Sequence, residues 1–308
     1  MSYKIGVDGG GTKTECMLVD ATGRMIAAHV GAGCNPSVVG PEQATSIILA
    51  ALNSLRAQAV THAAETPQAS PPAELISQTL LCMAGHRDFW RDLARKLPGF
   101  GRVTTTDDSF PVLELATGGR PGLVLHAGTG SFVAARAPDG STHYAGGLGW
   151  RFGDPGSGYD IGRRAVARGV LELQGWAPAS RLGAAVREHV QLGPEIDAGF
   201  VTRSYYQHAE PSRHVAAVAP IVLRLAAEGD TAARAIVLAS TGELLDLAVS
   251  VATKLFSTSL LATVHAGLSG PILNHPVVHE ALAARAPFPL EPITETPIEG
   301  VRRMLARS

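Results

Sequence analysis

The sequence has little cysteine, and the few cysteines present are scattered. Cys16, Cys34 and Cys82 are the three cysteines in 308 residues, and no two of them have the C-x-x-C spacing. This pattern argues against a disulfide framework, a zinc ribbon and a cysteine-ligated iron–sulfur cluster. An enzyme whose activity depends on such a cluster is therefore disfavoured.

An excess of either charge is also missing, and so is a clean membrane-spanning run. Lys plus Arg number 26 and Asp plus Glu number 27, so charge provides no attraction to nucleic acid or to an anionic membrane. The most apolar stretch, residues 233–256, contains Glu243, Asp246 and Lys254 and predicts a buried amphipathic helix. The N-terminus has no secretory signal pattern. We expect a cytoplasmic protein with neither nucleic acid nor membrane as a partner.

What is present is enough chain for two domains, because single cores rarely grow beyond about 250–300 residues. We place an N-terminal domain at 1–112 and a larger domain at 113–296, with the C-terminal helix 297–308 packing back on the first. In the first domain, alternating polarity, proline at the start of a helix and glycine turns predict three strands, a helix, a strand, a helix and a strand. Their ranges are 3–8, 14–20, 24–30, 41–60, 76–85, 86–97 and 101–107, with a polar surface loop at 61–73.

A related pattern then begins about 118 residues later. Residues 122–147 again read as a strand, a Gly/Thr loop, a strand, a turn and a strand, which favours a duplicated unit. The remaining patterns predict helices and one further strand. The helices are at 157–175, 180–190, 212–228, 230–256, 276–286 and 297–307, and the strand is at 260–267.

The stretch "GVDGGGTKT" near the N-terminus looks like a phosphate-binding loop. It is not a P-loop, because Thr12 separates Gly11 from Lys13, and it is not a dinucleotide fingerprint, because a strand follows in place of a helix. What remains is a tight hairpin with unobstructed backbone amides and the hydroxyls of Thr12 and Thr14, a geometry that binds anions. Asp8 at the strand end is a candidate magnesium ligand.

A second Gly/Thr hairpin, "HAGTGS" at 126–131, strengthens this interpretation. Together with "VHAGLSGPI" at 264–272, the two loops resemble the phosphate and adenosine motifs of the actin and sugar-kinase ATPase superfamily. The stretches "GCNPSVVG", "TTTDDS" and "GGLGWRFGDPGSGYDIG" resemble its N-acetylglucosamine kinase and BadF/BcrA-type branch. The match is colinear over nearly the whole chain. It implies an α/β fold of two ribonuclease H-like (actin-like ATPase) domains, each with a βββαβα core, and an ATP site in the interdomain cleft.

The resemblance also implies roles for individual residues. The nucleotide-binding positions, with Asp8 as the ligand of Mg²⁺, would be Asp8, Gly10, Gly11, Thr12, Lys13, Gly128, Thr129, Gly130, Gly267 and Ser269. The sugar-binding positions would be Asn35, Asp108, Gly147 and Asp154. Lys13 remains as compatible with a solvated side chain as with a phosphate contact.

The catalytic base that the resemblance implies is an aspartate after the strand 102–106, where two carboxylates compete. The pattern "SFPVL" fits better when Asp108 is the base, and Asp107 remains the alternative. The other aspartate would cap the helix at 109–117, a role that aspartate favours. The implied reaction is ATP-dependent phosphorylation of the 6-hydroxyl of an amino sugar, N-acetylglucosamine or glucosamine, by a possible homodimer. Pro155 and Leu148 depart from the family pattern beside the sugar site and leave the sugar open.

Two other functions compete with a sugar kinase. A BadF-type ATPase that activates a reductase or dehydratase needs an iron–sulfur cluster, which the spacing of the cysteines disfavours. A non-catalytic sensor of ATP or sugar would lack the base or Asp8, and both positions hold aspartate. Fold analogy alone does not decide between these functions, so the site residues carry the choice.

Overall fold

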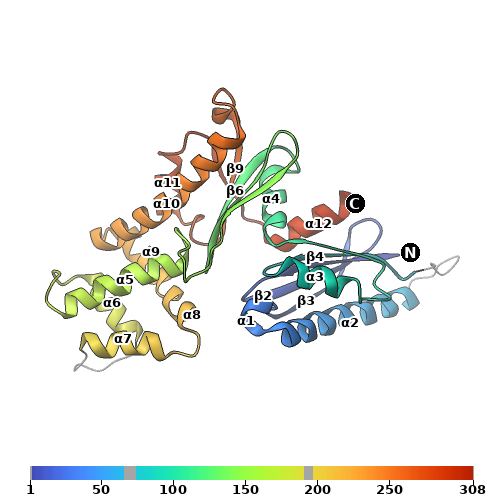
Figure 1. Cartoon of the computed structure of the whole chain (residues 1–308), viewed down its shortest axis with the longest axis horizontal. Helices are drawn as coiled ribbons and strands as arrows, with labels where there is room; N and C mark the ends of the chain where they lie inside the picture. The colour runs from blue at the N-terminus through green and yellow to red at the C-terminus, as the bar shows by residue number, and fades with distance from the viewer. Residues whose placement is uncertain (1, 66–73, 191–196, 308) are drawn as a thin grey trace. The chain divides into compact units, whose positions relative to one another are not determined.

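The computed structural model describes residues 2–65, 74–190 and 197–307. The chain forms two compact units, one made of Met1–Leu115 with Glu295–Ser308 and the other of Ala116–Thr294. Each unit is built around one mixed β-sheet with helices packed on it (Figure 1). The two units are described in turn.

The sheet of the first unit has the strand order β3-β2-β1-β4-β5. The first three strands form an antiparallel meander, and β4 and β5 run parallel to β1. Parallel neighbours need crossover connections, and helices provide them here. The strands are β1 (Tyr3–Gly9), β2 (Lys13–Val19), β3 (Met25–Ala32), β4 (Ile76–Met83) and β5 (Arg102–Asp107), and the helices between or after them are α1 (Pro36–Val39), α2 (Pro41–Glu65), α3 (Arg87–Ala94) and α4 (Ser109–Thr117).

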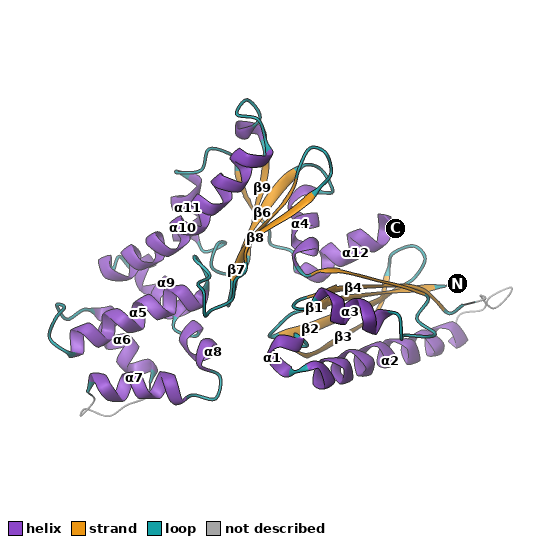
Figure 2. Cartoon of the chain, in the orientation of Figure 1, coloured by secondary structure: helices purple, strands orange, loops and turns teal. Residues whose placement is uncertain are grey.

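Helices cover both faces of this sheet, and β2 has apolar side chains on both of its faces to pack against them. Leu18 is part of the core that α2 closes, whereas its neighbours Met17 and Val19 pack with Val301 of α12 (Pro297–Arg307). Successive strand side chains point to opposite faces, so one apolar strand can support two helical layers. The sheet lies between α2 and α12 in Figure 2.

The second unit repeats the strand order, as β10-β9-β6-β7-β8. When β6 takes the place of β1, the antiparallel meander, the parallel strands and the sheet order all correspond. The duplicated α/β core expected from the sequence is therefore observed. The strands are β6 (Gly122–Ala127), β7 (Ser131–Arg136), β8 (Thr142–Gly146), β9 (His265–Ser269) and β10 (Leu290–Pro292).

The helices of the second unit make a larger layer around this sheet. The longest helix, α10, contributes buried residues to the same core as the strands. By length and composition it is the one helix of the described residues that could cross a membrane, and 44% of its most apolar window is buried, which is ordinary for the core helix of a globular protein. The helices are α5 (Gly158–Leu173), α6 (Arg181–His189), α7 (Ala198–Gln207), α8 (Pro211–Ala216), α9 (Ala219–Ala227), α10 (Thr231–Leu255) and α11 (Pro276–Ala283).

Several boundaries differ from the expectations. The helix α2 continues to Glu65 through part of the expected loop, and residues 66–73 lie outside the described residues. The helix expected at 212–228 is two helices, because Pro220 lacks the N–H that a continuous helix would use there. The helix α7 and the strand β10 were not predicted, and β9 begins only at His265.

Candidate active site

The carboxyl ends of three parallel strands bring the acidic residues of the first unit to one edge. Asp8 on β1 pairs in register with Cys82 on β4, and Met83 pairs with Asp107 on β5. Ligands of open α/β sheets bind at such carboxyl edges. Burial and then Glu15 raise the pKa of Asp8 to about 7, while Lys13 lowers it.

The loop between β1 and β2 is a tight hairpin with one open side. The amide of Gly10 donates to the Lys13 carbonyl at 3.0 Å, and the Cys34 amide donates to the Gly10 carbonyl at 3.0 Å. A Cβ on Gly33 would lie 2.2 Å from the Gly11 carbonyl oxygen, so glycine at 33 lets the chain approach the hairpin. A Cβ on Gly11, by contrast, would meet no atom within 4 Å. Neither packing nor a left-handed φ explains glycine at 11, which is consistent with space kept for a ligand.

The three residues after these glycines point in different directions. Thr12 is exposed, as a phosphate contact requires. The Lys13 ammonium donates to Glu15 at 2.7 Å along the surface of β2. The Thr14 hydroxyl is buried and donates to the Ala32 carbonyl at 2.8 Å. The expected phosphate contact by Thr14 is therefore wrong, because the strand alternation turns this side chain inward.

The two adjacent aspartates have opposite surroundings. Asp107 accepts hydrogen bonds from the Arg87 guanidinium at 2.9 Å and from the amide and hydroxyl of Ser109 at 3.2 and 2.9 Å. Burial alone would raise the pKa of Asp107, but these bonds outweigh it and the pKa is lowered. Asp108 has no salt bridge to any residue that the structure describes. Burial raises its pKa most, followed by Asp107, through its charge and a side-chain hydrogen bond, and then by the Asp8 charge. Asp107 is thus engaged at the start of α4, and Asp108 is the carboxyl suited to accept a proton near neutral pH.

Asn35 lies at the start of α1, held in one orientation. Its Oδ1 accepts from the Ser37 amide at 2.9 Å, as an N-cap. Gly85, with φ +89°, passes so close that a Cβ there would lie 2.4 Å from Asn35 Oδ1. The sequence analysis missed Gly85, and its one signal was a glycine at the last position of a predicted strand.

In the second unit, the loop at 128–130 is hydrogen-bonded to the first residues of α5. The Gly128 amide donates to the Gly130 carbonyl at 2.9 Å, which closes the turn. The first amides of α5 donate to the loop, Gly158 to Gly128 at 2.8 Å and Tyr159 to Thr129 at 3.3 Å. The positive end of a helix dipole favours an anion nearby. A Cβ on Gly128 would have His126 Nε2 as its nearest atom, at an ordinary contact distance of 3.5 Å.

Asp154 lies directly behind this loop. A Cβ on Gly130 would be 3.0 Å from Asp154 Oδ2, and Asp154 Oδ1 accepts from the Gly149 amide at 3.2 Å. Burial raises the pKa of Asp154 to about 6, even though the amides of Gly149 and Leu148 act to lower it. Gly147, at φ +61°, would clash with the Tyr144 hydroxyl if it had a Cβ. The second phosphate-binding candidate and the predicted sugar positions 147 and 154 are therefore neighbours within one unit.

The segment between these sugar positions exposes large apolar side chains. Leu148 is 64% exposed and Phe152 82% exposed, and Trp150 packs its ring 5.6 Å from Tyr159. The Arg151 guanidinium lies over the Trp150 ring at 5.2 Å. Exposed apolar side chains gathered in one short segment are typical of a recognition surface.

The predicted adenosine residues, Gly267 and Ser269, also make structural contacts within the second unit. A Cβ on Gly267 would lie 2.7 Å from Ala116 Cβ and from Ile293, inside the core of the second unit. Ser269 is buried and its Oγ lies 3.1 Å from Nδ1 of His126; burial lowers the pKa of this histidine to about 4. Gly270 belongs to the same stretch, 264–272, and lies next to the end of β6. A Cβ on Gly270 would clash with the Ala127 carbonyl oxygen at 2.2 Å. A nucleoside contact by Gly267 or Ser269 stays a prediction.

The donor set fits phosphate and magnesium better than a metal held by the protein alone. No group of three or more His, Cys, Asp or Glu side chains able to hold a metal exists among the described residues. Mg²⁺ commonly takes only one or two carboxylates and completes its shell with water and phosphate oxygens. Asp8, whose pKa burial raises, is suited to that arrangement because a nearby divalent cation would favour its charged form.

The chain is similar to known ATPases and sugar kinases. The profile of the BadF/BadG/BcrA/BcrD ATPase family matches residues 5–282. An N-acetyl-D-glucosamine kinase from Dictyostelium discoideum is 29% identical over 260 residues, which are 82% of this chain and 79% of that protein. A glucosamine kinase from Vibrio cholerae is 26% identical over 191 residues, 61% of this chain and 62% of that protein.

A solved structure supports the fold over the whole length. A protein from Chromobacterium violaceum, assigned as an N-acetylglucosamine kinase, is 26% identical and superposes with a TM-score of 0.75 over 99% of both chains. The two-domain actin-like ATPase fold expected from the sequence is thereby confirmed, with its two five-stranded mixed sheets.

Proposed function

We propose that this chain, which belongs to the BadF/BadG/BcrA/BcrD ATPase family, is an ATP-dependent hexosamine kinase that phosphorylates the 6-hydroxyl of its sugar. The observation that carries the proposal is the edge of the first sheet. There, a glycine hairpin with open space at Gly11 lies at the same edge as Asp108, a carboxyl outside the described salt bridges. Phosphoryl transfer needs these two parts, a site for phosphates and a group that orients the attacking hydroxyl.

Asp108 is the proposed general base. Its raised pKa means that its carboxylate is a stronger proton acceptor than an ordinary aspartate, so it takes the proton of a sugar hydroxyl more readily. Asp107 stays the alternative from the sequence, but its bonds to Arg87 and Ser109 give it a structural role.

The two glycine loops are the proposed phosphate sites. Gly10, Gly11 and Thr12 of the first unit and Gly128, Thr129 and Gly130 of the second carry small side chains and backbone groups suited to phosphate oxygens. Mg²⁺, held through Asp8, would neutralise phosphate charge when bound. That both loops hold one nucleotide, and that Lys13 takes part, stay predictions.

The sugar that we propose is acetylated. The exposed segment 148–152 carries Leu148, Trp150 and Phe152, which favour an apolar acetyl methyl. The guanidinium of Arg151, which lies over the Trp150 ring in this segment, carries a positive charge that disfavours the ammonium of free glucosamine. Both acetylated and free amino sugars are named for the relatives, and this local chemistry leads us to N-acetylglucosamine.

The test is product analysis with matched sugars. The protein is incubated with ATP, Mg²⁺ and either N-acetylglucosamine, glucosamine or glucose, and phosphorus–proton correlation NMR identifies the phosphorylated oxygen. We expect a 6-phosphate and the highest kcat/KM for N-acetylglucosamine. A phosphate on another hydroxyl, or ATP hydrolysis without a sugar phosphate, would contradict the proposal.

A further inference from the structure

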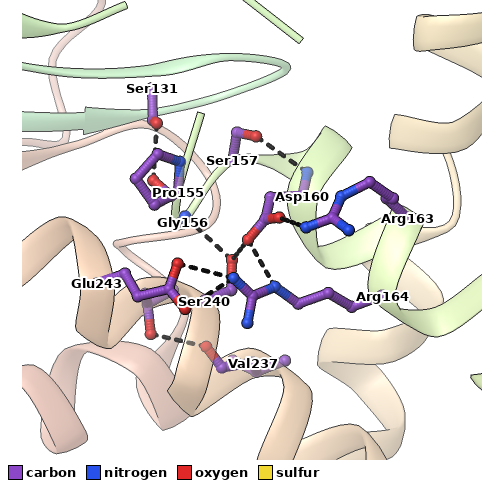
Figure 3. A network of polar contacts seen from close by, with 11 residues as sticks. Ser131, Pro155, Gly156, Ser157, Asp160, Arg163, Arg164, Val237, Ser240 and Glu243 are labelled. Carbon is purple, nitrogen blue, oxygen red and sulfur yellow. Dashed lines mark hydrogen bonds and ion pairs between the residues drawn. The ribbon is translucent and has the colours of Figure 1, made fainter. Parts of the chain in front are cut away.

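A buried polar network lies behind the turn that follows Asp154 (Figure 3). Ser240 of α10 donates its hydroxyl to Asp160 Oδ2 at 2.6 Å and accepts the Gly156 amide at 3.0 Å. Ser240 is fully buried and Asp160 is 3% exposed. One hydroxyl therefore joins a long core helix, a buried carboxylate and the backbone of the turn at 154–157.

The Asp160 carboxylate does not need the Ser240 hydroxyl to neutralise its charge. Asp160 also accepts from Arg163 at 2.6 Å and from Arg164 at 2.8 Å, and Arg164 pairs in addition with Glu243. A buried charge must be paired, and two guanidinium groups already pair this one. The hydrogen bond from Ser240 is therefore not needed to neutralise Asp160. Its effect is to connect Asp160 to the Gly156 amide, which donates to the same hydroxyl.

The same turn is attached on its other side to the loop at 128–130. The Ser131 hydroxyl, directly after that loop, donates to the Pro155 carbonyl at 2.7 Å. Ser157 caps α5, whose Gly158 amide donates to the Gly128 carbonyl at 2.8 Å. The turn is therefore held between the phosphate-loop candidate and Ser240.

We propose that Ser240 and Asp160 are positioning residues that fix the turn at 154–157, and through it the Asp154 carboxylate, against Gly130. The kinetic part of this inference rests on the proposed kinase function, but the positioning itself does not. Small displacements of groups that orient a substrate are costly to a reaction, since binding geometry supplies much of the rate. The charge of Asp160 acts on Asp154 as well, because it contributes, after burial, to the raised pKa of Asp154.

The neighbouring residue on α10 provides a matched control. Thr241 is fully buried like Ser240, but its hydroxyl donates to the Val237 carbonyl within the same helix at 2.8 Å. The substitution Thr241→Val removes a buried hydroxyl from the same core and breaks only a hydrogen bond within α10. Ser240→Ala removes the one that reaches Gly156.

Amide hydrogen exchange tests the positioning without any assay of activity. In the full-length protein, Ser240→Ala should speed exchange at Gly156 and in peptides from 147–158 by about threefold to tenfold, the loss of one hydrogen bond. Thr241→Val should leave these peptides unchanged. Equal exchange in both variants would overturn the proposal, whatever reaction the protein performs.

Kinetics then test whether the position matters for the reaction. With the sugar that the wild type phosphorylates, Ser240→Ala should lower kcat/KM by about tenfold, and Ser240→Thr, which keeps the hydroxyl, should restore it. Thr241→Val should leave kcat/KM near that of the wild type. Equal kinetic losses in Ser240→Ala and Thr241→Val at equal Tm would overturn the role in the reaction. A wild type inactive on every sugar would instead refute the proposed function and leave the exchange result standing.

Discussion

The β1–β2 loop of the first unit and the β6–β7 loop of the second occupy equivalent places in two sheets of one strand order. Both are short glycine hairpins in which a Cβ at Gly11 or Gly128 would meet no close neighbour. Their surroundings differ. Next to the first lie two carboxyls whose pKa burial raises, Asp8 and Asp108. Next to the second lies one such carboxyl, Asp154, together with the amides of α5 and a turn held by hydroxyl groups.

We infer a division of roles on a duplicated scaffold. In the proposed function, the first copy would supply the base and the magnesium ligand, the two carboxyls whose pKa burial raises. The second supplies a rigid, hydrogen-bonded support for its loop. The predictions below test this division by changing one copy at a time.

The largest effect is expected at Asp108. Asp108→Asn removes the proposed base and should lower kcat by roughly 10²–10⁴-fold, while ATP affinity measured by calorimetry stays near that of the wild type. Asp107→Asn is the comparison variant. It should lower stability, because it loses the bonds to Arg87 and Ser109, and it should lower kcat less than Asp108→Asn, because it changes the pKa of the base but keeps the base. Normal turnover in Asp108→Asn, or a larger loss of kcat in Asp107→Asn, would reverse the assignment of the base.

The loops themselves are the next test. Gly11→Ala should weaken ATP binding by roughly 10–100-fold, the loss of a charge-assisted contact, and should leave Tm unchanged or raised, since its Cβ meets nothing in the protein. Gly128→Ala should behave in the same way. Gly267→Ala is the contrast, because overpacking against Ala116 and Ile293 should lower stability by about 1–3 kcal/mol. Unchanged ATP affinity in both loop variants would contradict a phosphate role.

A smaller effect is expected behind the sugar site of the first unit. Gly85→Ala forces Asn35 away from its present orientation, and φ +89° adds backbone strain. The KM for the sugar should rise by about tenfold, with ATP affinity retained. If the KM for the sugar and the Kd for ATP rose together, the substitution would be disturbing the unit as a whole.

The smallest effect concerns stability. The pKa of Asp108 is raised in the folded state, so its ionisation destabilises folding; this cost grows as pH rises from the ordinary pKa of an aspartate to the raised one and is complete above the latter. Asp108→Asn should therefore raise the free energy of unfolding at pH 8 by on the order of 1–3 kcal/mol, and the gain should be smaller at pH 5 and vanish only below the ordinary pKa. Urea denaturation at both pH values measures it, and a loss of stability at pH 8 would contradict the burial account.

Local patterns in the sequence were sufficient for every strand except β10, for the two hairpins and for the duplication. The role of Asp108 came from the family resemblance, and only the structure shows that Asp8 and Asp108 lie at one edge, where the parallel strands end together. Local patterns did not reveal Gly85, Gly270 or Ser240, since each acts through a contact with a residue distant in sequence, such as Ala127 for Gly270. The inward turn of Thr14 was a missed strand alternation, and α7 lay in a polar stretch with weak periodicity.

The most direct test of the central claim is a coupled ADP-release assay with Mg²⁺ and ATP over a panel of hexoses and amino sugars. We predict release that depends on the sugar, is greatest with N-acetylglucosamine and is lost in Asp108→Asn. If no sugar stimulates release while ATP still binds, the protein is an ATP-binding sensor and the kinase account is wrong.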